Sequence, residues 1–161
     1  MIALQDNSPA VVVPGIYPML YAFFDDRGVL RQDPFRRQVD AALGTQAAGV
    51  AILGLGTEVS KLTFDERVEV LEVVAKRIDG CKPLLVTVYG DTITEQIEFS
   101  KRAIQSGASA LMLQPPSQKM DDAKLAGFFS EIISAVDCPV GIQNAPEFLG
   151  FGLSNQSLIA L

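Results

Sequence analysis

Short apolar runs alternate with longer amphipathic stretches along this chain, and no other feature constrains its fold as strongly. Four runs, at residues 50–55, 84–88, 110–113 and 139–142, are nearly continuous in apolar character. Such runs are typical of parallel strands that are covered on both faces. Residues 16–23 are expected to form a further strand, which makes five in all.

The stretches between these runs have the periodicity and the end signals of helices. Apolar residues follow helical spacing over 68–78 and again over 125–136, which places one apolar stripe on each helix. Gly80 and Gly107 follow two of the helices, where a positive φ ends a helix at little cost. Residues that can cap a helix start precede the stretches: Thr63 and Thr92, each with a glutamate three places later, then Asp121 and Ser154.

A faint internal repeat supports a regular order of strand and helix. Gly49 and Gly107 occupy matching places before two apolar runs and lie 58 positions apart, or two units of 29. A period near 30 indicates βα units and a parallel sheet. A complete (β/α)8 TIM barrel needs roughly 250 residues, so this α/β chain is expected to carry about its first five βα units. Residues 1–161 then form a single incomplete domain without the last three strands, and a free-standing doubly wound sheet is the alternative.

The balance of charged residues narrows the possible partners. The 13 Lys and Arg residues stand against 19 Asp and Glu, a formal charge of -6, so neither nucleic acid nor an anionic membrane is expected as a partner. The longest uncharged stretch, 7–24, is interrupted by three prolines and follows an acidic residue, which argues against a targeting or membrane segment. The chain has no histidine, so imidazole relays and His-ligated metals are excluded within it.

The cysteines and the loop carboxylates have plain interpretations. Cys81 and Cys138 have neither a CxxC spacing nor the framework of a secreted disulfide domain. They are expected to be buried packing residues just before two strands, in a cytoplasmic protein. Glu58, Asp91 and Glu147 lie in predicted loops, but their spacing matches no metal motif. Neither a metal nor a cofactor is therefore predicted.

Four segments, in consistent order through nearly the whole chain, resemble one enzyme family. They are Gly15-Ile-Tyr-Pro-Met-Leu-Tyr-Ala-Phe-Phe-Asp-Asp-Arg-Gly28, Gly54-Leu-Gly-Thr-Glu58, Leu62-Thr-Phe-Asp-Glu-Arg67 and Ile142-Gln-Asn-Ala-Pro146. They are similar to segments of the dihydrodipicolinate synthase and N-acetylneuraminate lyase family. The resemblance implies a (β/α)8 barrel and class I aldolase chemistry, in which a lysine forms a Schiff base with a 2-oxo acid, usually pyruvate. It also implies a homotetramer.

The resemblance assigns the carboxylate of the 2-oxo acid to the loop after the second strand. The family motif there is Gly-Thr-Thr-Gly-Glu, whereas this chain has Gly54, Leu55, Gly56, Thr57 and Glu58. Leu55 and Gly56 replace two hydroxyl residues, so backbone amides and Thr57 are left to bind the carboxylate. The alternative is that the glycines only form a tight turn between strand and helix.

Two further departures follow the fifth strand. Gln143 and Asn144 stand where the family carries Tyr-Asn-x-Pro, whose tyrosine shuttles a proton, and glutamine cannot act as an acid. Gln143 is expected to hold a water or a substrate hydroxyl, or else to bond only to neighbouring backbone. Phe148 falls where the synthases proper place an arginine for the second substrate's carboxylate. This argues against dihydrodipicolinate synthesis itself and favours another 2-oxo acid, for example a deoxy sugar acid.

Other strand ends complete the predicted site. Tyr89 and Gln114 follow the third and fourth strands, and the Tyr89 hydroxyl is the best placed for proton transfer, unless it only packs there with a wet hydroxyl. The family's Schiff-base lysine is expected at roughly position 170, past Leu161. Lys61 lies in a loop near the mouth and is expected to be a solvated residue rather than a substitute nucleophile.

The sequence thus predicts a lyase, either an aldolase or a hydro-lyase, that acts on pyruvate or another small 2-oxo acid. The lysine that forms the Schiff base is expected outside these 161 residues. The alternative is a non-catalytic part of a barrel that binds only small acids or a partner through its open strand edges.

Overall fold

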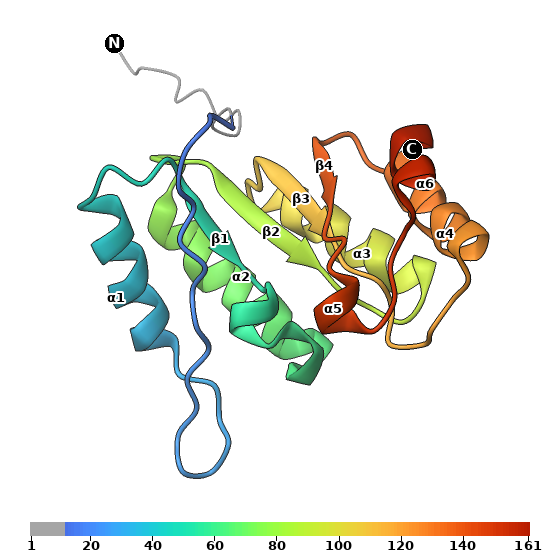
Figure 1. Cartoon of the computed structure of the whole chain (residues 1–161). Helices are drawn as coiled ribbons and strands as arrows, with labels where there is room; N and C mark the ends of the chain where they lie inside the picture. Colours follow the sequence, from blue (N-terminus) through green and yellow to red (C-terminus); the bar gives the residue numbers. More distant parts are fainter. Residues whose placement is uncertain (1–11) are drawn as a thin grey trace.

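A computed structural model describes residues 12–161 of the chain (Figure 1). Residues 1–11, which include the beginning of the uncharged stretch 7–24, lie outside the described part. The elements follow in the order α1 (Gln32–Leu43), β1 (Val50–Ile52), η1 (Leu55–Thr57), η2 (Val59–Lys61), α2 (Phe64–Ile78), β2 (Leu84–Val88), α3 (Ile93–Gln105), β3 (Ala110–Leu113), α4 (Asp122–Ser134), β4 (Val140–Ile142), α5 (Pro146–Leu149) and α6 (Asn155–Ala160). Among these helices, none is long and apolar enough to cross a membrane.

The four strands form one parallel sheet whose spatial order, β1-β2-β3-β4, is the order of the chain. The register pairs Leu85 of β2 with Ala110 of β3, and Leu111 of β3 with Val140 of β4. A helix connects each strand to the next. A doubly wound sheet reverses its strand order at a switch point, whereas a barrel keeps the same direction throughout. The arrangement confirms the predicted incomplete barrel.

The predicted first strand, 16–23, is extended chain beside β1 rather than a regular strand (Figure 1). Met19 forms a single parallel bridge with Ala51. The Leu20 amide donates to the Ala51 carbonyl at 2.9 Å, and the Ala51 amide donates to the Pro18 carbonyl at 3.0 Å. Proline has no amide hydrogen to donate, which limits the ladder here. The prediction of a full strand is therefore wrong, although the segment occupies the first place in the sheet.

The two faces of the sheet differ in burial, which corrects the expectation that both are covered. Side chains on one face, such as Ile52 and Val86, are fully buried and pack with the helices in a single core. On the other face Leu85 and Met112 are half-buried, whereas Ala51 and Thr87 are buried. The whole of β4 is half-buried as well. The partly buried face is the one that a barrel turns toward its interior. Within residues 12–161, β4 is the last strand of the sheet and has a strand on one side only.

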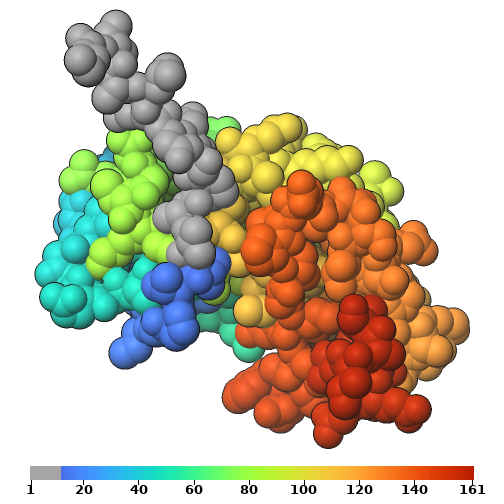
Figure 2. All heavy atoms as spheres, turned by 90° about the horizontal axis from the view of Figure 1, so that it is seen from above, coloured from blue at the N-terminus to red at the C-terminus, as the bar shows by residue number. Residues whose placement is uncertain are grey.

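Exposed apolar side chains gather near both ends of this sheet. Residues 12–30 carry several of them, including Ile16, which is 78% exposed. At the other end Phe148 and Ile159 are 77% and 87% exposed. Figure 2 shows the two regions, blue and red, as separate parts of the surface. Large exposed apolar side chains are unusual on a closed domain, and their position fits an unclosed barrel.

The helix starts form as the sequence predicts, with one exception. Thr63 and its glutamate make a complete capping box at α2. Asp121 and Ser154 cap α4 and α6 through their side-chain oxygens. Thr92 caps α3 in the same way, but Glu95 turns its carboxylate toward other partners. The second capping box is therefore half formed, because Glu95 has a different role.

The chain turns sharply before β2 and β3, at the end of the sheet opposite the predicted site. Gly80 and Gly107 have φ of 70° and 95°, a conformation that glycine adopts freely. Cys138 is half-buried and Cys81 is exposed, and both are free thiols. The prediction that both are buried packing residues is wrong for Cys81, because it lies in the surface turn that follows Gly80.

Candidate active site at the carboxyl ends of the strands

A pocket of 390 Å³ lies where the carboxyl ends of the strands meet. Its walls come from η1 and η2 after β1, from the residue after β2, from residues 114–117 after β3, and from α5 after β4. Four residues predicted for the site share this pocket: Leu55, Glu58, Tyr89 and Gln114. Active sites of parallel α/β barrels form at this end of the strands, so the pocket is the candidate active site.

The loop after β1 is shaped by a close approach to the first segment. A Cβ at Gly54 would meet the end of the Met19 side chain, which is flexible and has room to shift only by leaving this contact. The positive φ angles fall instead on Leu53 at 62° and Glu58 at 56°. Such angles cost a residue with a side chain about 1 kcal/mol or more. The loop is therefore held in a strained form on both sides of η1.

The polar groups of this loop divide into those already bonded and those available to a ligand. The buried Thr57 hydroxyl donates to the Leu20 carbonyl at 2.5 Å. The amides of Thr57 and Glu58 each donate at 3.0 Å, to the carbonyls of Gly54 and Leu55. As the first residues of a 3-10 helix, Leu55 and Gly56 have no carbonyl partner for their amides within η1. These two amides are therefore available to bind a carboxylate, as are the amides of Val59 and Ser60 at the start of η2.

Two predicted site residues on neighbouring strands are hydrogen-bonded to each other. Gln114 Nε2 donates to Gln143 Oε1 at 2.8 Å, and Gln114 is 2% exposed. The backbone of Gln114 is fixed from both sides, by its own amide on Val88 and by Gln96 Nε2 on its carbonyl. The bond between the two side chains uses the Gln143 oxygen, so the Gln143 NH2 group, with its two N–H donors, is free to bind another acceptor.

Asn144 is engaged with the loop that follows β4. Its Nδ2 donates to the Leu153 carbonyl at 3.0 Å, and its Oδ1 accepts the Leu153 amide at 2.8 Å. This reciprocal pair closes the loop that contains α5, which contributes Phe148 to the pocket. Asn144 thus shapes the wall of the pocket through the backbone.

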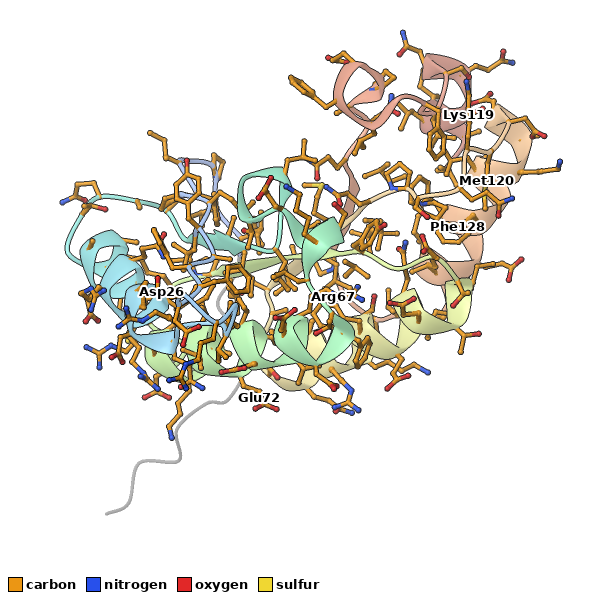
Figure 3. All side chains as sticks on the ribbon, turned by 90° about the horizontal axis from the view of Figure 1, so that it is seen from below. Asp26, Arg67, Glu72, Lys119, Met120 and Phe128 are labelled. Carbon is orange, nitrogen blue, oxygen red and sulfur yellow. The ribbon has the colours of Figure 1, made fainter. Side chains whose placement is uncertain are left out.

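A buried arginine fixes the chain around Tyr89. Arg67 belongs to α2 (Figure 3), and its side chain is 6% exposed. Its guanidinium donates to the Tyr89 carbonyl and, at 2.7 Å, to Glu95 Oε1. Glu95 Oε2 accepts the Asp91 amide at 3.2 Å. A Cβ at Gly90 would lie only 2.8 Å from the Glu95 carboxyl carbon. The lack of a side chain at Gly90 therefore leaves space for the Glu95 carboxylate.

The environment of Tyr89 keeps its hydroxyl protonated. Burial raises the pKa of Tyr89 most, and the nearby Asp91 charge raises it further. A side-chain hydrogen bond with Ser117 and the Arg67 charge act in the opposite direction. The Arg67 guanidinium lies 5.7 Å from the centre of the Tyr89 ring. A neutral phenol at the pocket wall is a group that can give a proton to a substrate.

The lysine of the pocket is paired at the surface. Lys61 Nζ lies 2.7 Å from Glu58 Oε1, and the two side chains are 71% and 63% exposed. A paired ammonium has no lone pair for attack on a carbonyl. Among residues 12–161, no cluster of His, Cys, Asp or Glu is placed to hold a metal ion.

The sequence analysis did not single out Arg67, Glu95 or Ser117 as residues of the site. Arg67 had a usable signal, because it falls three residues before Val70 and four before Leu71, on the apolar stripe of its helix. A charge on such a stripe needs a buried partner. Ser117 had no comparable signal, because its amide contacts Asp91, which lies after a different strand.

A parallel sheet of βα units in chain order, with polar groups collected at the carboxyl ends of the strands, defines this molecule as a partial (β/α) barrel. Residues 13–161 match the model of the dihydrodipicolinate synthetase family over almost the whole described chain. The protein belongs to that family, as the motifs predicted.

Three relatives illustrate the range of the family. The 4-hydroxy-tetrahydrodipicolinate synthase of Pelobacter propionicus is 30% identical over 83% of this chain and 47% of its own length. YagE of Escherichia coli K12, for which 2-dehydro-3-deoxy-D-gluconate aldolase activity is proposed, is 28% identical over 87% and 47%. The L-2-keto-3-deoxyarabonate dehydratase of Azospirillum brasilense is 28% identical over 82% and 44%.

The solved structure of YagE in complex with pyruvate has the same fold. It superposes with a TM-score of 0.83 and 28% identity, over 89% of this chain and 49% of YagE. The chain thus spans about half the length of the relatives it matches. The coverage agrees with the open β4 edge and with the half-buried inner face of the sheet.

Proposed function

We propose that the chain is part of a 2-oxo acid lyase, an aldolase or a hydro-lyase, that works through a lysine Schiff base. The shared pocket of Leu55, Glu58, Tyr89 and Gln114 at the strand ends carries this proposal. Membership of a family with synthase, aldolase and dehydratase members supports it. The reactive lysine is proposed to come from the part of the barrel that lies outside residues 1–161.

The proposed role of Tyr89 is to supply the proton that imine formation requires. A neutral lysine amine adds to the ketone and gives a carbinolamine. The Tyr89 phenol then gives its proton to the carbinolamine hydroxyl, which leaves as water. The nitrogen lone pair forms the C=N bond, and a protonated imine and a phenolate remain. In this assignment Tyr89 takes the proton-transfer role of the family tyrosine. Gln143 stands at the position of that tyrosine, and glutamine has no proton of suitable acidity.

The carboxylate of the 2-oxo acid is proposed to bind in the loop after β1. The amides of Leu55 and Gly56 are its donors, and Thr57 supports the loop through its bond to Leu20. Amides that turn toward one point bind an anion without a charged side chain. In this proposal the loop replaces the two hydroxyl groups of the family motif with main-chain donors.

The far end of the substrate is proposed to carry hydroxyl groups rather than a second carboxylate. The free amide of Gln143 and the neighbouring Gln114 are neutral at every pH, and Phe148 offers only apolar surface. Lys61, the cation in the pocket wall, is already paired with Glu58. Neutral amide groups suit a hydroxyl, which both donates and accepts, whereas a carboxylate calls for a cation. A 2-keto-3-deoxy sugar acid fits this description. A cytoplasmic homotetramer, as the family resemblance implies, belongs to the same proposal.

Turnover of a substrate panel tests the proposal. The complete gene product that contains these residues is incubated with 2-keto-3-deoxy sugar acids, and with pyruvate plus an aldehyde. Release of pyruvate or loss of water from a sugar acid is expected. A preference for a second substrate that carries its own carboxylate would overturn the substrate assignment. No reaction with any 2-oxo acid would overturn the proposed function.

A further inference from the structure

We infer that Gln96 is a positioning residue for the Gln114–Gln143 pair, and that it thereby tunes the recognition of one substrate hydroxyl. The inference rests on the proposed function, in which the Gln143 NH2 group binds a hydroxyl of the substrate. Gln96 belongs to α3 and is fully buried. It is not among the residues that line the candidate pocket, so it acts on the substrate through other side chains.

Both N–H donors of the Gln96 side chain are used, each on a different strand end. Gln96 Nε2 donates to the Gly90 carbonyl at 2.9 Å and to the Gln114 carbonyl at 3.0 Å. Gly90 lies two residues after the end of β2, and Gln114 lies one residue after the end of β3. Two carbonyl acceptors on one atom identify it as the NH2 group, because an amide oxygen cannot donate. The orientation of this side chain is therefore set by its partners.

The Gln96 side chain joins β2 and β3 where their backbones separate. Within the described chain, the last backbone bond between the two strands runs from the Gln114 amide to the Val88 carbonyl at 3.0 Å. If the parallel ladder continued, the Gln114 carbonyl would accept the amide of a residue past Val88. It accepts Gln96 Nε2 in that place. Gln114 is thus held at both ends of its main chain, and one of the two bonds comes from α3.

The position of Gln114 affects the position of Gln143. Gln114 Nε2 donates to Gln143 Oε1 at 2.8 Å, so the Gln143 NH2 group is left for the substrate. A hydrogen bond weakens steeply as its angle departs from the preferred one. A displacement of the Gln114 main chain is therefore carried to the Gln143 amide. Gln96 thus acts, through Gln114, on the group that is proposed to bind the hydroxyl.

A buried amide at position 96 has a cost that its two bonds offset. Gln96 Oε1 has no hydrogen-bond partner among residues 12–161, and neither has Ser100 Oγ, one turn along the same buried face of α3. An unpaired buried oxygen destabilises a protein. An apolar residue of similar shape would remove that cost, but it would leave the Gly90 and Gln114 carbonyls without this donor. The amide is therefore explained by its effect on the two strand ends, not by the packing of α3.

Discrimination between substrates that differ by one hydroxyl tests the inference. The complete gene product is assayed with a six-carbon 2-keto-3-deoxy sugar acid and with two analogues, each lacking one hydroxyl beyond the fourth carbon. The measured quantity is the ratio of kcat/KM for the sugar acid to kcat/KM for an analogue. Gln143→Leu is expected to abolish the discrimination against one analogue, which identifies the hydroxyl that Gln143 binds.

Variants of Gln96 then measure its share of this discrimination. Gln96→Met keeps the length of the side chain and removes both donors, so it is expected to lower the ratio by about 3- to 10-fold, the worth of one hydrogen bond. Gln96→Glu keeps one O–H donor when protonated, the form that burial favours. It is expected to give an intermediate ratio, and it carries the test if the methionine variant does not fold. Ser100→Ala is the control on the same buried face, with the wild-type ratio expected.

The ratio separates positioning from a merely structural effect. A general loss of structure lowers kcat/KM for every substrate by the same factor and cancels in the ratio. A role through Gln143 also requires that Gln96→Met leaves the ratio unchanged in a Gln143→Leu background. A wild-type ratio in either Gln96 variant, or a further change in the Gln143→Leu background, would overturn the inference. The absence of discrimination by the wild type against both analogues would overturn it as well.

Urea unfolding distinguishes a failure of this inference from a failure of the proposed function. The free energy of unfolding is compared for Gln96→Met, Gln143→Leu and the double variant at one protein concentration. Both side chains bond to Gln114, so their effects are expected to be non-additive. Additive effects would overturn the inference whether or not the enzyme turns over. If no 2-oxo acid reacts and the effects are non-additive, the proposed function is wrong and the coupling through Gln114 stands.

Discussion

Replacement of Arg67 by methionine should destabilise the chain by an amount that follows from its contacts. The substitution leaves the Tyr89 carbonyl without its donor, at a cost of about 1–3 kcal/mol for a buried acceptor. The ion pair with Glu95, whose side chain is 30% exposed, adds about 1 kcal/mol after solvent screening. Methionine fills most of the volume and keeps contact with the surrounding rings. The free energy of unfolding should therefore fall by about 2–4 kcal/mol.

Urea unfolding followed by far-ultraviolet circular dichroism measures this loss, with linear extrapolation to water. Arg67→Lys is the matched control, because it keeps the charge and loses the planar fork of donors. It should lose about half as much stability as the methionine variant, since one ammonium can serve the carbonyl or Glu95 but not both well. A loss below about 0.5 kcal/mol for Arg67→Met, which is the range of ordinary surface changes, would refute the reasoning.

Two further predictions concern a glycine and a carboxylate. A Cβ at Gly49 would lie 2.5 Å from the Pro83 carbonyl oxygen, so Gly49→Ala should lower the free energy of unfolding by about 1–3 kcal/mol through overpacking. Gly127→Ala, in open space within α4, should raise it by roughly 0.5–1 kcal/mol. Equal effects in urea unfolding would contradict this contrast. Hydrogen bonds from Ser157 and Ser154 lower the pKa of Asp122 from its ordinary 3.8. The stabilisation is present above that value and is lost as the pH falls through the lowered one. Asp122→Asn should therefore flatten the acid side of the stability profile, and an unchanged pH dependence of the urea midpoint would show that the contact is unimportant.

Features of the fold that depend on local sequence could be predicted. The helix starts at Thr63, Asp121 and Ser154 depend on side chains that reach only three residues along the chain. The apolar runs became strands for a similar reason, although the first is shorter than its run of 50–55. Leu53 ends it early, because its φ of 62° cannot continue a strand.

Features that depend on distant partners could not be predicted. The burial of the inner face of the sheet depends on which other segments pack against it, and a single apolar run does not specify them. The general rule that sites form at strand ends was enough to predict that Tyr89 and Gln114 belong to one site, and both line the same pocket. The rule does not tell which side chains bond to each other, so the pairing of Gln114 with Gln143 and of Asp91 with Ser117 emerged only from the structure.

The position of the Schiff-base lysine is the most direct test of the proposed chemistry. The complete gene product is treated with pyruvate and borohydride, digested, and mapped by mass spectrometry. A single modified lysine is expected beyond residue 161, at the carboxyl end of the strand that follows β4, with Lys61 unmodified. An adduct on Lys61, or the absence of any modified lysine, would contradict it.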